Sequence, residues 1–117
     1  MNICVVGTGY VGLVTGTCLA DFGHTVICVD NNKDKVDLLN SGGVPIYEIG
    51  LDDLIKRNTK EKRLSFTTDL CAAIKQSLVI FNAVGTPSRE DGTANLDYVF
   101  KVAREIAGCM DGYKVVV

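Results

Sequence analysis

Three glycines spaced as G-x-G-x-x-G, at Gly7, Gly9 and Gly12, constrain the fold of this chain more than any other feature. They follow an apolar, β-branched run at Asn2–Val6 and open a helical pattern. In such a strand-to-helix turn the first glycine permits the tight turn, the second lets a pyrophosphate approach, and the third allows close packing. The helix N-terminus adds free amides and a partial positive charge. The segment predicts a dinucleotide site; the alternative is a glycine-rich turn without a ligand.

Asp30 stands at the end of a second apolar run, Thr25–Val29. A carboxylate in this position can accept hydrogen bonds from both hydroxyls of an adenosine ribose, and it repels the 2′-phosphate of NADP. The sequence therefore favours NAD, although Lys33 and Lys35 are nearby cations that would attract NADP. Asp30 could instead cap the helix that begins near Asn32, and the two roles are compatible.

Short apolar runs alternate with helical patterns along the whole chain. The expected strands are Asn2–Val6, Thr25–Val29, Leu64–Thr67, 78–84 and 114–117. The expected helix signals are N-caps at Thr68 and Asn95 and a stop at Gly42-Gly43. This alternation indicates an α/β class, a doubly wound and mostly parallel sheet, in one domain over residues 1–117. Loop 85–94 follows the fourth strand, so we expect it near a ligand site.

Composition argues against several kinds of partner. The net charge is -2, which gives no general attraction to nucleic acid or to an anionic membrane surface. No apolar run approaches the roughly 18 residues of a membrane-spanning helix. The first residues also lack the basic region of a signal peptide. We therefore expect a cytoplasmic protein.

The chain has five cysteines, Cys4, Cys18, Cys28, Cys71 and Cys109. None of them forms a C-x-x-C pair, and the chain has only one histidine, so no metal site is expected. The odd number and the apolar neighbours predict reduced, buried thiols, as in a cytoplasmic protein.

Four segments together resemble the UDP-glucose/GDP-mannose dehydrogenase family. They are GTGYVGL near the start, GHTVICVD ending at Asp30, PIYEIGLDDLI from Pro45 and AVGTPSREDGTANLDYV from Ala83. They follow the family's order and spacing and cover essentially the whole chain. The resemblance implies a Rossmann-type NAD-binding domain that ends after about the fifth strand.

The resemblance also implies particular cofactor contacts. Besides Gly7, Gly9 and Gly12, the matching positions are Tyr10, Val11, Asp30 at the ribose, Lys35 near the adenosine, and Thr86 after the fourth strand. Thr86 could instead be a turn residue before Pro87, and Lys35 a solvated helix charge. The family often has proline at Ile49 and Ser88 and an apolar residue at Asn82, so the substrate loop and strand packing are less closely matched.

The family reaction oxidises the primary alcohol of a nucleotide sugar to a carboxylate with two NAD, through a cysteine thiohemiacetal. The PIYE and EDGTANL segments look closer to the members that act on UDP-glucose than to those that act on GDP-mannose or UDP-N-acetylmannosamine. A free-standing nucleotide-sensing module is a further alternative. The family's catalytic residues come after position 117, so no catalytic residue is expected here and this chain alone should be inactive. The full-length enzyme should bind its sugar through further domains and form a homo-oligomer.

Overall fold

The computed structural model describes residues 1–117. Its ten elements, in chain order, are β1 (Asn2–Val6), α1 (Tyr10–Asp21), β2 (Thr25–Val29), α2 (Lys33–Asn40), α3 (Leu51–Lys60), β3 (Leu64–Thr67), α4 (Leu70–Gln76), β4 (Val79–Asn82), α5 (Asp97–Cys109) and β5 (Val115–Val116). The strands form one sheet in the order β3-β2-β1-β4-β5. Every neighbouring pair is parallel, which confirms the doubly wound α/β fold and makes the sheet wholly parallel.

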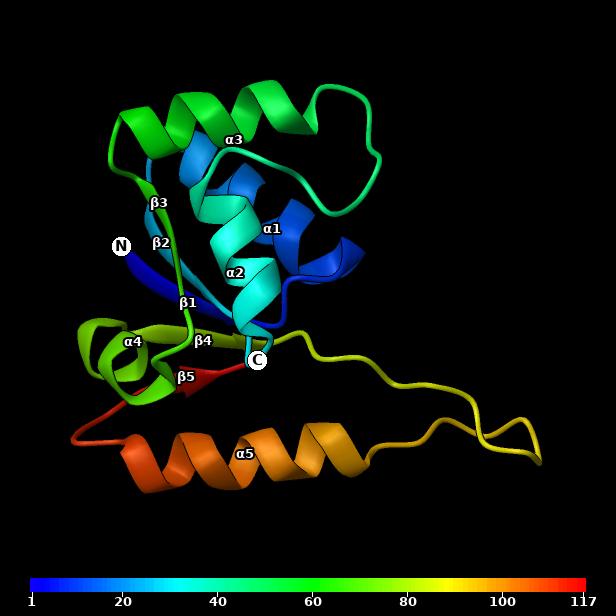
Figure 1. Ribbon diagram of the computed structural model, residues 1–117. Helices are drawn as coiled ribbons and strands as arrows, with labels where there is room; N and C mark the ends of the chain where they lie inside the picture. Colours follow the sequence, from blue (N-terminus) through cyan, green and yellow to red (C-terminus); the bar gives the residue numbers. More distant parts are fainter.

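Helices cover both faces of the sheet (Figure 1). The helices α1, α2 and α3 pack on one face, and α4 and α5 pack on the other. In β1, Ile3 and Val5 belong to the first core while Cys4 and Val6 belong to the second, because successive side chains of a strand point to opposite faces. Strands buried on both faces read as continuous apolar runs, which is why the sequence revealed them.

Element boundaries differ from the sequence prediction mainly at the ends of the fourth and fifth strands. The fourth and fifth strands span Val79–Asn82 and Val115–Val116, shorter than the predicted 78–84 and 114–117. The ladder continues for one residue beyond β4, where Ala83 N donates to Val6 O at 2.8 Å, and the chain then leaves the sheet. None of the helices combines the length and the apolar character that crossing a membrane requires.

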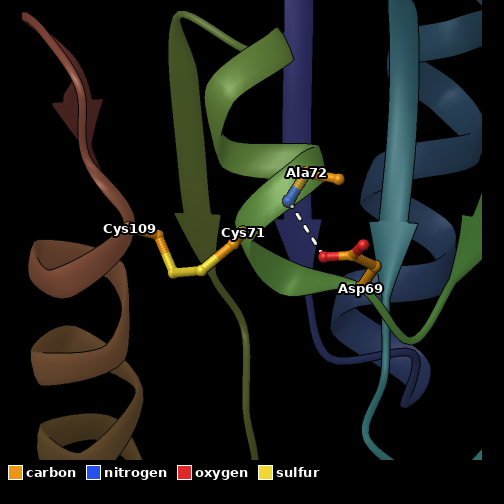
Figure 2. Close-up of a disulfide and its surroundings, with 4 residues drawn as sticks. All are labelled: Asp69, Cys71, Ala72 and Cys109. Atoms are coloured by element: carbon orange, nitrogen blue, oxygen red, sulfur yellow. Dashed lines mark hydrogen bonds between the residues drawn. A yellow bond between two sulfur atoms is a disulfide. The ribbon is translucent and has the colours of Figure 1, made fainter.

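Three helix ends lie at the predicted positions or within one residue of them. The predicted N-cap at Thr68 is wrong, because Asp69 caps α4 by accepting from Ala72 N at 3.0 Å (Figure 2). The predicted N-cap at Asn95 is also wrong, because Leu96 occupies that position; Asn95 lies one residue earlier, and its Oδ1 accepts from Asp97 N at 2.9 Å. The stop at Gly42-Gly43 is confirmed, since α2 ends just before it and Gly42 has a φ of 93°.

Two of the five cysteines are not the reduced thiols that the sequence predicted. Cys71 on α4 and Cys109 at the end of α5 form a disulfide, with 5.0 Å between their Cα atoms (Figure 2). They are 38 residues apart in sequence and meet because both helices cover the same face of the sheet. Cys4, Cys18 and Cys28 remain thiols, as predicted. Burial raises the pKa of both Cys4 and Cys28 to about 12.

Candidate cofactor site

A cleft of about 960 Å³ opens at the carboxyl ends of the central strands. The strand order reverses between β1 and β4, and doubly wound sheets bind their ligands outside that point. Seven predicted cofactor residues line the cleft: Gly7, Gly9, Tyr10, Val11, Asp30, Lys35 and Thr86. The eighth, Gly12, lies behind the turn and is buried.

The three glycines of the turn have different physical roles. Gly7 has a φ of 103°, and a Cβ there would lie 2.6 Å from Ala83 O. A Cβ on Gly12 would collide with Gly7 O, so both positions need glycine for the packing of the chain itself. Gly9 differs, because its φ is -73° and no atom lies within 4 Å of a Cβ built there. The fold does not require glycine at position 9, and the space in front of it fits an approaching pyrophosphate.

The start of α1 borders the same space. No side chain caps α1 at Gly9, and its first turn contains no acidic residue. The first amides of a helix have no partner within the helix and carry a partial positive charge. An uncapped N-terminus that opens on a cleft is therefore suited to a diphosphate. Tyr10 and Val11, which begin the helix, are exposed on this side.

Asp30 is held at the end of β2 by bonds from two segments. Its Oδ2 accepts from Thr8 N at 3.0 Å and from Thr8 Oγ1 at 2.7 Å. Its Oδ1 accepts from Asn32 N at 3.0 Å, and Lys35 Nζ lies 3.6 Å from Oδ2. The α2 helix is capped by Asn32, whose Oδ1 accepts from Lys35 N, so the alternative role of Asp30 as that N-cap is wrong. Asp30 instead joins the glycine turn to the start of α2.

The electrostatics keep the Asp30 carboxylate ionised. Burial raises the pKa of Asp30, but this effect is outweighed by the Thr8 hydroxyl, the amides of Asn32 and Thr8, and the Lys35 ammonium, all of which lower it. The pKa therefore lies below its ordinary value of 3.8. A carboxylate can accept about four hydrogen bonds, and the chain itself supplies three. One ribose hydroxyl therefore fits without any change, whereas a second requires one of these bonds to be exchanged.

The α5 helix provides a wall of the cleft that no sequence pattern predicted. Tyr98, Lys101, Val102 and Glu105 line the cleft, together with Leu70 of α4. Their spacing of three and four residues places the four α5 side chains on one helix face. That face mixes polar and apolar residues, so hydrophobic periodicity did not distinguish it. Thr86 also lines the cleft and belongs to the loop between β4 and α5. This loop extends away from the body of the domain (Figure 1).

A parallel doubly wound sheet that joins a glycine turn, an uncapped helix N-terminus and an ionised strand-end carboxylate in one cleft defines a Rossmann-type dinucleotide-binding domain. Residues 1–117 match the UDP-glucose/GDP-mannose dehydrogenase family, NAD binding domain, over their whole length. The chain belongs to this family as its NAD-binding domain.

Two curated relatives and one solved structure illustrate the similarity. The UDP-glucose 6-dehydrogenase of Rhizobium meliloti is 53% identical and covers 100% of this chain and 27% of its own length. A UDP-glucose 6-dehydrogenase of Bacillus subtilis is 49% identical, and the match covers 99% of this chain and 25% of the length of that relative. A ternary complex of GDP-mannose dehydrogenase from Pseudomonas aeruginosa has a TM-score of 0.87 and 46% identity, over 91% of this chain and 24% of its own. The chain thus spans about a quarter of the length of these relatives.

Proposed function

We propose that this cleft binds NAD and that individual residues have distinct roles in holding it. The amides at the start of α1 hold the diphosphate in front of Gly9, while Gly7 and Gly12 shape the turn. Asp30 accepts from the adenosine ribose, with Lys35 and Thr8 fixing its carboxylate. Tyr10, Val11 and Thr86 border the cofactor. The open space in front of Gly9 supports these roles, because the packing of the chain itself does not require a glycine at that position.

The proposal extends to the reaction of the whole protein. We propose an NAD-dependent dehydrogenase that oxidises UDP-glucose to UDP-glucuronate, working as a cytoplasmic homo-oligomer with its sugar held by further domains. The identity to UDP-glucose 6-dehydrogenases supports this substrate. Oxidation of GDP-mannose is the second candidate, because a GDP-mannose 6-dehydrogenase of Pseudomonas aeruginosa is 46% identical over 106 residues. NAD, when bound, supplies the hydride acceptor, and this chain's own residues bind and orient it.

Residues 1–117 are expected to bind NAD without oxidising any nucleotide sugar. Positioning a substrate against the nicotinamide can supply roughly 7–11 kcal/mol of barrier reduction, and we expect the groups that hold the sugar to lie outside these residues. Absorbance of NADH would be followed at high protein concentration with NAD and each of UDP-glucose, GDP-mannose and UDP-N-acetylmannosamine. The same assay would use the full reading frame that encodes the chain.

The full reading frame should form NADH fastest with UDP-glucose. Faster turnover of GDP-mannose would replace the first candidate by the second. Turnover by residues 1–117 that disappears when one of their own cysteines is replaced would show that the chemistry lies within this domain, against the proposal.

A further inference from the structure

The disulfide joins the two helices that cover one face of the sheet. Cys71 lies in the first turn of α4, and Cys109 is the last residue of α5 (Figure 2). Cys71 is exposed, whereas Cys109 is half-buried. A reductant in solution can therefore reach the Cys71 side of the bond. The three remaining thiols are elsewhere, on β1, α1 and β2.

Apart from the disulfide, α5 is held mainly by the packing of one helix face against the core. Ile106 is its only fully buried residue. Val99, in the first turn of α5, accepts a hydrogen bond through its carbonyl oxygen from Asn82 Nδ2 of β4 at 3.1 Å. The Oδ1 atom of Asn82 is buried without a hydrogen-bond partner. The contact between β4 and α5 therefore satisfies only half of the Asn82 amide. At its C-terminal end the covalent bond to Cys71 supplements the packing of Ile106.

The same two helices form one wall of the cofactor cleft. Leu70, the residue before Cys71, lines the cleft, and so does Glu105, which lies one helical turn before Cys109. Lys101 and Val102 line it one turn earlier. The disulfide thus fastens the end of the segment whose middle faces the cofactor site. A displacement of α5 relative to α4 would change the shape of this wall.

We propose that Cys71–Cys109 is a redox-modification site, acted on by dithiol reductants, whose oxidised form holds α5 against α4 and so sets the affinity of the cleft for NAD. This inference rests on the proposed function of the cleft. One thiolate of the reductant attacks the sulfur of Cys71, the exposed residue of the pair, the S–S bond breaks, and Cys109 leaves as a thiolate that takes up a proton. The second thiolate of the reductant then attacks the mixed disulfide. It releases Cys71, which also takes up a proton, and the reductant closes to a cyclic disulfide. The protein gains the two electrons that the reductant loses.

The direction of the effect follows from preorganisation. When the wall is fixed, NAD meets a cleft that is already shaped, whereas a mobile α5 must be ordered as NAD binds. Couplings between two sites typically change affinity by about 5- to 150-fold, and we expect the lower part of that range, about 5- to 20-fold weaker NAD binding on reduction. In the cytoplasm proposed above most thiols are kept reduced, and disulfides there are usually transient and redox-sensing.

The test compares NAD affinity in the two redox states of the chain. Thiol titration in denaturant should first find three free thiols without reductant and five after dithiothreitol, because only Cys4, Cys18 and Cys28 are free. Calorimetric titration with NAD, well below the melting temperature of each form, should then give about 5- to 20-fold weaker binding after dithiothreitol. The double variant Cys71→Ser/Cys109→Ser should bind like the reduced chain and ignore dithiothreitol. The control Cys18→Ser should keep the full response.

Hydrogen–deuterium exchange supplies a readout that does not depend on NAD. Reduction should speed exchange of the amides at 98–105 and leave those of β1 and β2 unchanged. Five free thiols before reduction, or equal NAD affinity in both states, would overturn the inference. Absence of NAD binding in both states would overturn the proposed function instead. Redox control of α5 would then stand if exchange at 98–105 responds to dithiothreitol, and would fall if it does not.

Discussion

Replacement of Gly9 by valine should weaken NAD binding by at least about 100-fold, or roughly 2.7 kcal/mol, while the domain stays folded. The backbone at Gly9 has a φ of -73° and no atom within 4 Å of a Cβ, so valine meets no protein atom near its Cβ. The branched side chain would instead occupy the space in front of the first amides of α1, where the diphosphate must approach. Circular dichroism and calorimetric titration with NAD on one sample measure both effects.

Two other glycines serve as matched controls for Gly9→Val. Gly112 also has open space around a Cβ and lies in the turn before β5, outside the cleft, so Gly112→Val should leave NAD affinity unchanged. The Gly12→Val variant should lose the circular dichroism spectrum of the folded domain, because a Cβ at position 12 would collide with Gly7 O. Unchanged NAD affinity in a folded Gly9→Val variant would mean that the glycine turn serves only the fold.

Replacement of Asp30 by alanine should weaken NAD binding by about 10- to 100-fold and reduce the preference over NADP. A hydrogen bond to a charged group contributes roughly 1.5–3 kcal/mol, and the carboxylate also repels a 2′-phosphate. Titration of both cofactors against the wild type and the variant measures the change.

Because the pKa of Asp30 is lowered in the folded state, its ionised form also stabilises the folded chain above its ordinary pKa of 3.8. That contribution is lost as pH falls through the lower pKa of the folded state.

The variant Thr8→Val separates the two roles of Asp30. Thr8 is fully buried, and valine of similar shape removes the 2.7 Å bond from Oγ1 while keeping the carboxylate in the cleft. Its midpoint of unfolding should fall, with a smaller loss of NAD affinity than in Asp30→Ala. Equal affinity of the wild type for NAD and NADP would refute the assignment of Asp30 to the ribose. Equal losses of NAD affinity in the two variants would show that Asp30 acts only by holding the glycine turn.

Local chemistry explains what the sequence could predict. The turn at Gly7 and the packing at Gly12 are backbone requirements of neighbouring residues, so the spacing of the glycines is enough to infer them. The strands buried on both faces were equally clear, because burial leaves a continuous apolar run. Asp30 was placed by its position at the end of β2, and its ties to Thr8 and Asn32 became clear only in the fold.

Contacts between distant segments explain what the sequence could not predict. The Cys71–Cys109 bond depends on the relative placement of α4 and α5, which no spacing encodes. The contribution of Lys101 and Glu105 to the cleft depends on how α5 is rotated about its axis. The cap at Asp69 rather than Thr68 is a local difference, which depends on a single residue of register, the usual uncertainty of helix ends.

The location of bound NAD on the chain in solution decides whether this cleft is the cofactor site. Nuclear magnetic resonance spectra of the 15N-labelled oxidised chain would be recorded during titration with NAD. Saturable shifts are expected at the amides of Gly9, Tyr10, Val11 and Asp30 and along 98–105, with little change at α3, which lies outside the cleft. Saturable shifts confined to other surfaces, or no saturable shift at Gly9 and Asp30, would contradict the assignment of this cleft to NAD.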